Sequence, residues 1–448
     1  MRLTPHDGVF LSENRILRLN KKGEEEMKKI IALVLALVLC VGLLAGCGGK
    51  KEGGVIKIGY VNPTTGALAG NGEGVDWLVA EIENYVNNTM GGIEVDGTKK
   101  TIDVIVYDSG SDSAKCGEMA AKLCDEDEVD VIIAVQTPET VIPVANTAEA
   151  YGVPCIAIQA PVNPVAGNLP AEAKWTVHAF WTIEKVYEQY KALWAAAGYL
   201  PNTGAKVGIA FANDADGSAW YDIFKANLEK DGYVLVDPGK YPSLTNDISS
   251  VVNTFKAADI DILAGTNIPP DFATLYTQLI SAGVEVGCVT MGKCCLLEGD
   301  INSLEGLGVG IMTEVWWAPT NPFTSALTGV SAADLGAKYS KDNDGRAMPQ
   351  PAAYGYAGLE LAIQALQKAG TTDKAKVYEA MKSLDVETVV GPIKYDQKML
   401  GLTYGDTVLG GGQWQMIDGK LQLVVIDNSV YPVVPTTGSY VAGNATNK

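Results

Sequence analysis

The sequence predicts an α/β protein built from two doubly wound parallel sheets. Short apolar runs of strand length alternate with amphipathic segments of helix length from Val55 onwards. The same alternation restarts after Trp175 and produces a second unit of similar size. Runs such as Val129–Ala134 are almost continuously apolar, as expected of parallel strands that helices cover on both faces.

In the first unit, β-branched and alternating segments are predicted as strands, and the segments with helical periodicity between them as helices. The predicted strands are 55–61, 101–107, 129–134 and 154–158. The predicted helices are 75–86, 114–123 and 139–151.

In the second unit, the predicted helices are 184–197, 218–230, 248–255 and 272–281. The predicted strands between them are 206–211, 233–237, 261–264 and 286–291. Three further helices are expected at 332–341, 352–368 and 374–383, and the tail after Gly391 alternates like short strands.

The N-terminal region has the order of a lipoprotein signal peptide. Lys28 and Lys29 precede an apolar run, 30–44, and the run ends in Leu44-Ala45-Gly46-Cys47, which is typical of a bacterial lipobox. An uncleaved transmembrane helix is the alternative, but the run is short and no stop-transfer charges follow it. We therefore expect lipidation of Cys47, which would anchor an extracytoplasmic protein to the cell membrane.

Three further expectations concern this region. Residues 27–46 are expected to be the signal peptide and 47–54 a polar tether. Residues 1–26 do not fit a signal peptide, and 23–26 (Gly-Glu-Glu-Glu) are what a translated purine-rich ribosome-binding site gives. We expect synthesis to start at Met27.

Composition and charge exclude several classes of function. The formal net charge of −19 argues against nucleic acid as a partner. His178 is the single histidine after Cys47, so neither a Ser-His-Asp set nor a multi-histidine metal site is expected. No phosphate-binding loop occurs. We therefore expect that the protein is not an enzyme and uses no metal or cofactor, and that His178 has a structural role.

Six cysteines remain after Cys40 and Cys47. No spacing among them is typical of a metal site, and Cys116 and Cys124 lie too far apart on a predicted helix to form a disulfide. Free buried thiols are the expected state, although an export compartment permits disulfides.

The expected ligand site is a cleft between the two units, because ligands of open α/β sheets bind beyond the carboxyl ends of the strands. The loops at these ends are 62–74, 136–138, 159–161, 213–217, 266–270 and 292–295.

At several of these loops the chain resembles a known family. The residues that carry the resemblance are Ile58-Gly59-Tyr60, Pro63 to Gly70, Tyr107-Asp108-Ser109, Val389 to Asp396, and Gln413-Trp414. They are similar, in order and spacing, to motifs of type I periplasmic binding proteins of the leucine/isoleucine/valine-binding class, which are receptors of ABC importers.

The resemblance implies two lobes joined by a three-strand hinge. Lobe one would comprise 55–178 and 316–397, and lobe two 179–315 and 398–448. The implied function is binding of a small polar, carboxylate-bearing solute and its delivery to an ABC permease, by a monomer. The implied solutes are an amino acid of branched-chain type, an amide or an organic acid. A lipoprotein that senses a ligand and signals to a membrane partner is the alternative.

The resemblance also implies which residues of lobe one contact the ligand. Thr137, next to Gln136, aligns with the hydroxyl that holds the ligand carboxylate, although an ordinary helix cap is the alternative. Gln159 and Ala160 align with the next carboxylate-contacting loop. Asn71 takes the place of an aromatic lid in relatives.

Four more ligand contacts are expected around lobe two. Trp181 begins its first helix, where it would stack on the ligand or belong to the core. Asp216 and Asn267 align with cleft-facing side chains, and Asp216 would bind an ammonium or cap a helix. Cys294 stands where amino-acid receptors of the class tend to have an acidic residue, which weakens the α-amino-acid prediction.

Two alternatives stay open beside Cys294. Lys293 would bring a positive charge to a second carboxylate of the ligand. Cys294 and Cys295 would form either a vicinal disulfide or two packed thiols.

Overall fold

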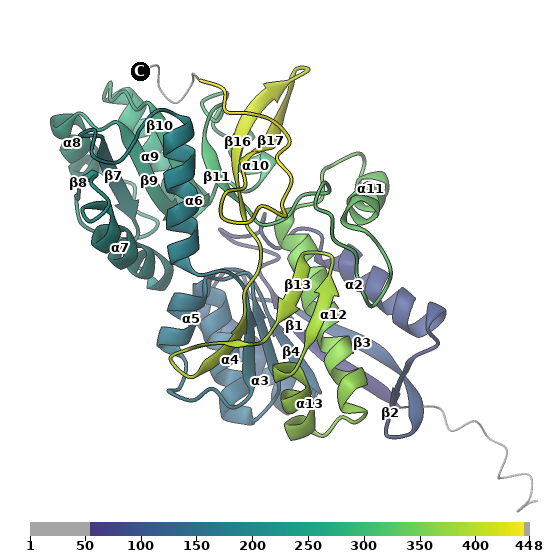
Figure 1. The fold of residues 1–448 in the computed structure, drawn as a ribbon. Coiled ribbons are helices and arrows are strands. Elements are labelled where there is room, and N and C mark those ends of the chain that lie inside the picture. Colours follow the sequence, from purple (N-terminus) through teal and green to yellow (C-terminus); the bar gives the residue numbers. More distant parts are fainter. Residues whose placement is uncertain (1–53, 443–448) are drawn as a thin grey trace, which may run out of the picture. The chain divides into compact units, whose positions relative to one another are not determined.

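The computed structural model describes residues 54–442, which contain two large sheets and their covering helices (Figure 1). The predictions for the start site, the signal peptide and Cys47 lie outside the described residues. Between residues 54 and 442, no helix has both the length and the apolar character needed to cross a membrane.

The first sheet has eight strands in the order β14-β15-β6-β5-β4-β1-β3-β2. Its strands pair in parallel except β2 and β14, which lie antiparallel at the two edges. The strands are β1 (Val55–Asn62), β2 (Ile93–Val95), β3 (Thr98–Asp108), β4 (Val131–Ala134), β5 (Cys155–Ile158), β6 (Thr176–Ala179), β14 (Gln397–Met399) and β15 (Leu402–Gly405).

The second sheet has seven strands in the order β17-β16-β11-β10-β9-β7-β8. Its first five strands along the chain are parallel, and the last two are antiparallel. The strands are β7 (Lys206–Phe211), β8 (Val234–Val236), β9 (Ile262–Asn267), β10 (Cys288–Lys293), β11 (Met312–Val315), β16 (Gly410–Ile417) and β17 (Lys420–Asp427). A separate hairpin joins β12 (Asp385–Thr388) to β13 (Gly391–Lys394). The prediction of two parallel sheets is confirmed.

Helices cover both faces of each sheet because successive strand residues point to opposite sides. In β4, Ile133 packs in the cluster that contains α2 and α12, whereas its neighbour Ile132 packs with α3 and α4. The helices around the first sheet are α2 (Val75–Asn84) with the π-helical turn η1 (Tyr85–Thr89), α3 (Ser113–Asp125), α4 (Pro138–Tyr151), α5 (Val162–Asn168), α12 (Gln350–Ala369) and α13 (Lys374–Lys382).

The second sheet is covered in the same way. In β9, Ile262 packs in the cluster that contains α6 and α7, and Leu263 packs with α8 and α9. The helices are α6 (Ile183–Ala196), α7 (Ala215–Leu228), α8 (Ser249–Ala258), α9 (Pro269–Ser281) and α10 (Glu298–Asn302). Helix α11 (Ala332–Asp342) lies against α2, where the rings of Trp77 and Tyr339 meet edge to face at 5.1 Å.

The chain passes between the two sheets three times. The passages follow β6, β11 and β15, and the Phe180 N–H in the first donates to the Gly405 carbonyl of the third at 3.2 Å. The third passage comes later than the predicted boundary at 397/398. The reason is that β14 and β15 extend the first sheet, with β15 paired to β6.

All six cysteines of the described residues are free and buried. Cys294 and Cys295 have their sulfur atoms 3.7 Å apart and unbonded, so the structure has two packed thiols rather than a vicinal disulfide.

His178 lies in the middle of the first sheet on β6 and is fully buried. Its Nε2 is 2.7 Å from the Ala160 carbonyl oxygen, which can only accept, so this nitrogen carries the proton. Burial lowers the pKa of His178 to about 4, and the hydrogen bond to Ala160 only partly offsets this. The folded protein therefore holds this imidazole neutral.

Stability should therefore fall in acid through His178. Between pH 6.5 and 4 the unfolded chain binds a proton at this residue that the folded chain does not, so the free energy of unfolding decreases as the pH is lowered, by about 3 kcal/mol. Urea unfolding at several pH values should show that loss in the parent and a smaller loss in His178→Gln. Above pH 7 the pH dependence of the two proteins should match. Equal acid losses in both would contradict the prediction.

Candidate functional site

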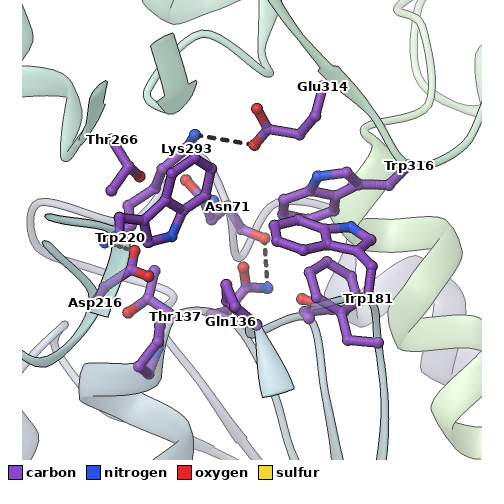
Figure 2. A pocket seen from close by; sticks show the side chains of 14 residues that line it. Asn71, Gln136, Thr137, Trp181, Asp216, Trp220, Thr266, Lys293, Glu314 and Trp316 are labelled. Carbon is purple, nitrogen blue, oxygen red and sulfur yellow. Dashed lines mark hydrogen bonds and ion pairs between the residues drawn. The ribbon is translucent and has the colours of Figure 1, made fainter. Parts of the chain in front are cut away.

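One cavity lies at the carboxyl ends of the parallel strands and takes side chains from both sheets (Figure 2). The first sheet contributes residues that follow β4, β5 and β6, and the second contributes residues from the ends of β9, β10 and β11 and from the start of α7. The lining residues are Asn71, Gln136, Thr137, Pro138, Gln159, Pro161, Phe180, Trp181, Asp216, Trp220, Thr266, Lys293, Glu314 and Trp316.

Three strand ends at the cavity share an unusual backbone conformation. Gln136, Gln159 and Lys293 have φ values of 79°, 69° and 65°, a left-handed region that side chains other than glycine seldom adopt. Gln136 lies two residues after the end of β4, Gln159 directly follows β5, and Lys293 is the last residue of β10. Such conformations cost free energy and gather at functional sites, where neighbouring structure holds them.

Thr137 opens α4 but does not cap it with its side chain. Its hydroxyl is buried without a hydrogen-bond partner and lines the cavity. The helix-cap alternative for Thr137 is therefore wrong. The hydroxyl is instead free to bind a ligand at the N-terminal end of α4, where backbone N–H groups and the helix dipole favour negative charge.

Asp216 is not a cap either, because Asp214 performs that role by accepting the Gly217 N–H at 2.7 Å. Asp216 is 2% exposed and lies 2.6 Å from the Lys293 ammonium. Glu139, at the start of α4, lies 3.6 Å from the same ammonium and accepts the Asp216 N–H at 3.0 Å. The three side chains thus form an ion cluster that joins the first unit to the second.

The pKa directions within this ion cluster follow from burial and mutual charge. Burial raises the pKa of Asp216 to about 7, Lys293 opposes the rise, and Glu139 adds to it. Burial acts to lower the pKa of Lys293, but the carboxylates outweigh it and raise the pKa above its ordinary value. For Glu139, Lys293 overcomes the effect of burial and holds the pKa below its usual range.

An aromatic wall stands on the other side of the cavity. Trp181 and Trp316 lie together there (Figure 2), with their ring centroids 6.1 Å apart. Phe180 packs edge to face on Trp316 at 4.9 Å, and Trp220 meets Trp181 edge to face at 6.2 Å. These rings offer apolar faces to a ligand and also hydrogen-bond donors at their edges.

The cavity is lined by buried polar atoms that have no partner within the protein. Most buried polar atoms of native structures are hydrogen-bonded, so a group of exceptions in one place needs an explanation. The unpartnered lining atoms are Asn71 Oδ1, Gln136 Oε1, Thr137 Oγ1, Gln159 Oε1, Asp216 Oδ1, Thr266 Oγ1, and the indole nitrogens of Trp181, Trp220 and Trp316. Donors and acceptors are both present, so the site can bind a molecule with both kinds of group.

The free space at the centre of the site is small. About 20 Å³ is open to the centre of a water molecule, which is room for roughly one or two waters. An amino acid or an aromatic acid would enter only if the surrounding side chains or the two sheets moved apart.

Six of the nine predicted ligand residues line the cavity. They are Asn71, Gln136, Thr137, Gln159, Trp181 and Asp216.

The other three predicted ligand residues do not line the cavity. Ala160 is fully buried in the cluster under α3 and α4. Asn267 follows the lining residue Thr266 in β9, so it points to the opposite face, where it donates to the Ala210 carbonyl at 3.2 Å. Cys294 follows Lys293 and packs in the cluster under α8 and α9.

The predicted ligand residues did not include Thr266, Trp220 or Glu314, and Lys293 was included only as an alternative. Glu314 could have been found, because a glutamate inside the buried strand Met312-Thr313-Glu314-Val315 is rare without a partner or a role. Trp220 gave no signal, since an aromatic on a helix is usually a core residue.

Comparison with known proteins agrees with this architecture. The family model described as "Periplasmic binding protein" matches residues 55–400. The Leu/Ile/Val-binding protein homolog 3 of Brucella melitensis is 25% identical over 351 residues, which cover 76% of this chain and 87% of that protein.

Solved structures show the same fold. A leucine-binding protein from Thermotoga maritima superposes with a TM-score of 0.67 at 18% identity and covers 84% of this chain and 99% of its own. An ABC-transporter solute-binding protein from Rhodopseudomonas palustris, in complex with p-hydroxybenzoic acid, has a TM-score of 0.67 at 17% identity, with 85% and 98% covered. These are solute-binding proteins rather than enzymes.

Removing one carboxylate from the ion cluster should destabilise the protein. Asp216→Asn leaves the buried Lys293 without its 2.6 Å partner, so the free energy of unfolding should fall by about 3 kcal/mol. Asp222→Asn, an exposed change on the same helix, should stay within about 0.5 kcal/mol of the parent. Urea unfolding at pH 8 measures both values. Equal stabilities of the two variants would show that the ion cluster contributes little.

Proposed function

The chain belongs to the periplasmic binding protein family, a class of extracytoplasmic solute-binding proteins, and we propose that its solute is a small carboxylate-bearing molecule with an apolar or aromatic body. The solute would bind in the cavity between the two sheets. A closed complex would then deliver it to an ABC permease.

The observation that carries this proposal is the Thr137 hydroxyl. It is buried, has no partner in the protein, and faces the cavity from the N-terminal end of α4. A hydroxyl beside the N–H groups at the start of a helix suits a carboxylate. A neutral solute would lack the negative charge that the N-terminal end of α4 favours.

The aromatic wall supports the second half of the proposal. Trp181 and Trp316 lie across the cavity from Thr137 (Figure 2), so a ligand held at Thr137 would place its body against indole rings. The ligands named for the two similar structures fit this proposal, because leucine and p-hydroxybenzoic acid each combine a carboxylic acid with an apolar body.

Closure around the solute would follow from the position of the site. Both sheets supply contacts, so a ligand in the cavity binds the closed arrangement more tightly than an open one. That difference in affinity is what drives closure. A permease could then distinguish loaded from unloaded receptor by the relative position of the two units.

A Thr137→Ala variant tests the carboxylate end. Losing a hydrogen bond to a charged group should weaken binding of the active ligand about tenfold or more. The ligand would first be found by a thermal-shift screen of amino acids, aromatic acids, amides and sugars, since a ligand that binds only the folded state raises the melting temperature. Isothermal titration calorimetry would then give the affinities.

Thr147→Ala is the matched control for this test. Thr147 lies on the same helix, its hydroxyl donates to the Pro143 carbonyl one turn earlier, and it does not line the cavity. It should leave the affinity unchanged. A sugar as the best ligand, or unchanged acid binding in Thr137→Ala, would refute the proposed carboxylate site.

Lipid anchoring through Cys47 is part of the proposal and has its own test. Cys47→Ser removes the thiol to which the lipid would be attached. Expressed in a bacterial host, the variant should leave the membrane fraction, whereas the parent should stay there and incorporate labelled palmitate. Membrane retention of Cys47→Ser would refute the lipid anchor.

A further inference from the structure

One ion pair joins the two units beside the cavity. Glu139 lies in the first turn of α4, on the first unit, and its carboxylate is 3.6 Å from the Lys293 ammonium at the end of β10, on the second unit. The ion pair between Lys185 and Asp406, in contrast, lies at the third passage of the chain, where the backbone itself connects the units. The Glu139 pair is therefore placed where separation of the units would break it.

A hydrogen bond strengthens the same junction. The Asp216 N–H, at the start of α7, donates to the Glu139 carboxylate at 3.0 Å. A single side chain of the first unit thus contacts two groups of the second, the ammonium of Lys293 and the backbone of Asp216. Hydrogen bonds to an ionised acceptor are stronger than those between neutral groups. Glu139 is therefore well placed to stabilise the junction of the units.

The charges of the second unit both attract and repel Glu139. Lys293 attracts it, whereas Asp214 and Asp216 carry the same sign of charge as Glu139. Burial acts to raise the pKa of Glu139, but Lys293 and the Asp216 N–H outweigh burial and hold the pKa below its usual range. The attraction prevails, so the ionised form of Glu139 is more stable where the units meet than it would be in water.

The two units meet too closely to enclose a solute. About 20 Å³ at the centre of the site is open to the centre of a water molecule, which is room for roughly one or two waters. At another point, the loop after β1 reaches the second unit, since a Cβ atom on Gly70 would lie 2.9 Å from Leu297 Cδ1. The contacts that join the units in this arrangement are made by the protein itself.

We propose that Glu139 is a latch, meaning a side chain that closes the two units in the absence of solute, so that solute enters only those molecules in which its contacts are broken. The proposal does not rest on the identity of the solute, and Glu139 does not line the cavity. Its contacts with Lys293 and Asp216 exist only where the units meet, so they shift the population toward the closed arrangement. The open fraction then limits how readily any solute binds.

A thiol introduced into the cavity would measure the open fraction. Thr266 lines the cavity on β9 and is 2% exposed, so Thr266→Cys would bury a thiol there. N-ethylmaleimide is a neutral thiol reagent that is too large for the closed cavity. When opening and closing are fast relative to labelling, the labelling rate is proportional to the population of the open form. Mass spectrometry of peptides from the purified, solute-free protein gives this rate for each cysteine.

The proposal predicts that Glu139→Gln accelerates labelling of the introduced thiol about tenfold, because it removes the charge that pairs with Lys293. Glu139→Lys should accelerate labelling further, since it places a second ammonium beside the first. Both variants would be made in the Thr266→Cys background and compared with that background alone.

Glu149→Gln is the matched control. Glu149 lies on the same helix and accepts the N–H groups of Lys174 and Trp175 at 2.8 Å, contacts that stay within the first unit. The control removes one negative charge, as Glu139→Gln does, but breaks no contact between the units. It should change the labelling rate of the introduced thiol by less than about twofold.

The native cysteines report unfolding in the same experiment. All six in residues 54–442 are buried, and Cys155 and Cys288 lie on strands inside the two sheets, where separation of the units does not expose them. Their labelling should stay equally slow in every variant. If Cys155 and the introduced thiol accelerate together, Glu139 opposes unfolding rather than opening, and the latch is overturned.

Three further results would overturn the latch. The first is an equal labelling rate in the Thr266→Cys background and in Glu139→Gln. The second is acceleration by Glu139→Lys alone, because new repulsion would then act without any loss of a native attraction. The third is labelling of the background protein as fast as that of the chain unfolded in urea. No solute takes part, so the latch and the carboxylate site tested by Thr137→Ala can each fail without the other.

Discussion

Both sheets are covered by helices on their two faces, and this constraint decides where the protein can place polar groups. Strands such as β4, Val131–Ala134, are apolar on both sides, since each side packs against a different pair of helices. The strand ends are therefore the places where side chains that need a polar partner are most easily accommodated. Gln136, Gln159 and Lys293 lie at such ends, in a backbone conformation that their surroundings must hold.

The two units are connected at the site itself by charge. Glu139 comes from the first turn of α4, while Asp216 and Lys293 belong to the second unit. The contacts of Glu139 with the Lys293 ammonium at 3.6 Å and with the Asp216 N–H at 3.0 Å cross between the two sheets. Separating the units would return Glu139 to water and leave Lys293 with Asp216 alone. The contacts of Glu139 are thus available only when the two units meet at the cavity, as they do in this structure.

The site also carries a cost in free energy that a solute can recover. Three indole N–H groups and three side-chain amide oxygens at the cavity are buried without a hydrogen-bond partner in the protein. Each such group costs free energy in an empty site. A molecule with both acceptors and donors would form the missing hydrogen bonds and so recover this free energy, whereas a purely apolar molecule would not. Selectivity would thus come from polar matching, with the aromatic wall supplying affinity.

The sequence by itself determined the class of fold and most of the lobe-one site. Periodicity located the long helices and most of the strands, but it missed α5 and α10, which are too short to show a helical period, and the short strands β2, β6, β11 and β12. For β2, the Asp96-Gly97 turn was the available signal. Gln136, Thr137 and Gln159 could be predicted, because a residue that directly follows a buried parallel strand must lie at the edge where ligands bind. The sequence could not tell which of two neighbouring residues faces the cavity. Thr266 lines it and Asn267 does not, and Lys293 lines it and Cys294 does not. Only the tertiary structure decided this, and only it brought Glu314, Trp220 and Trp316 to the same cavity, because their positions depend on how strands and helices distant in sequence pack against one another.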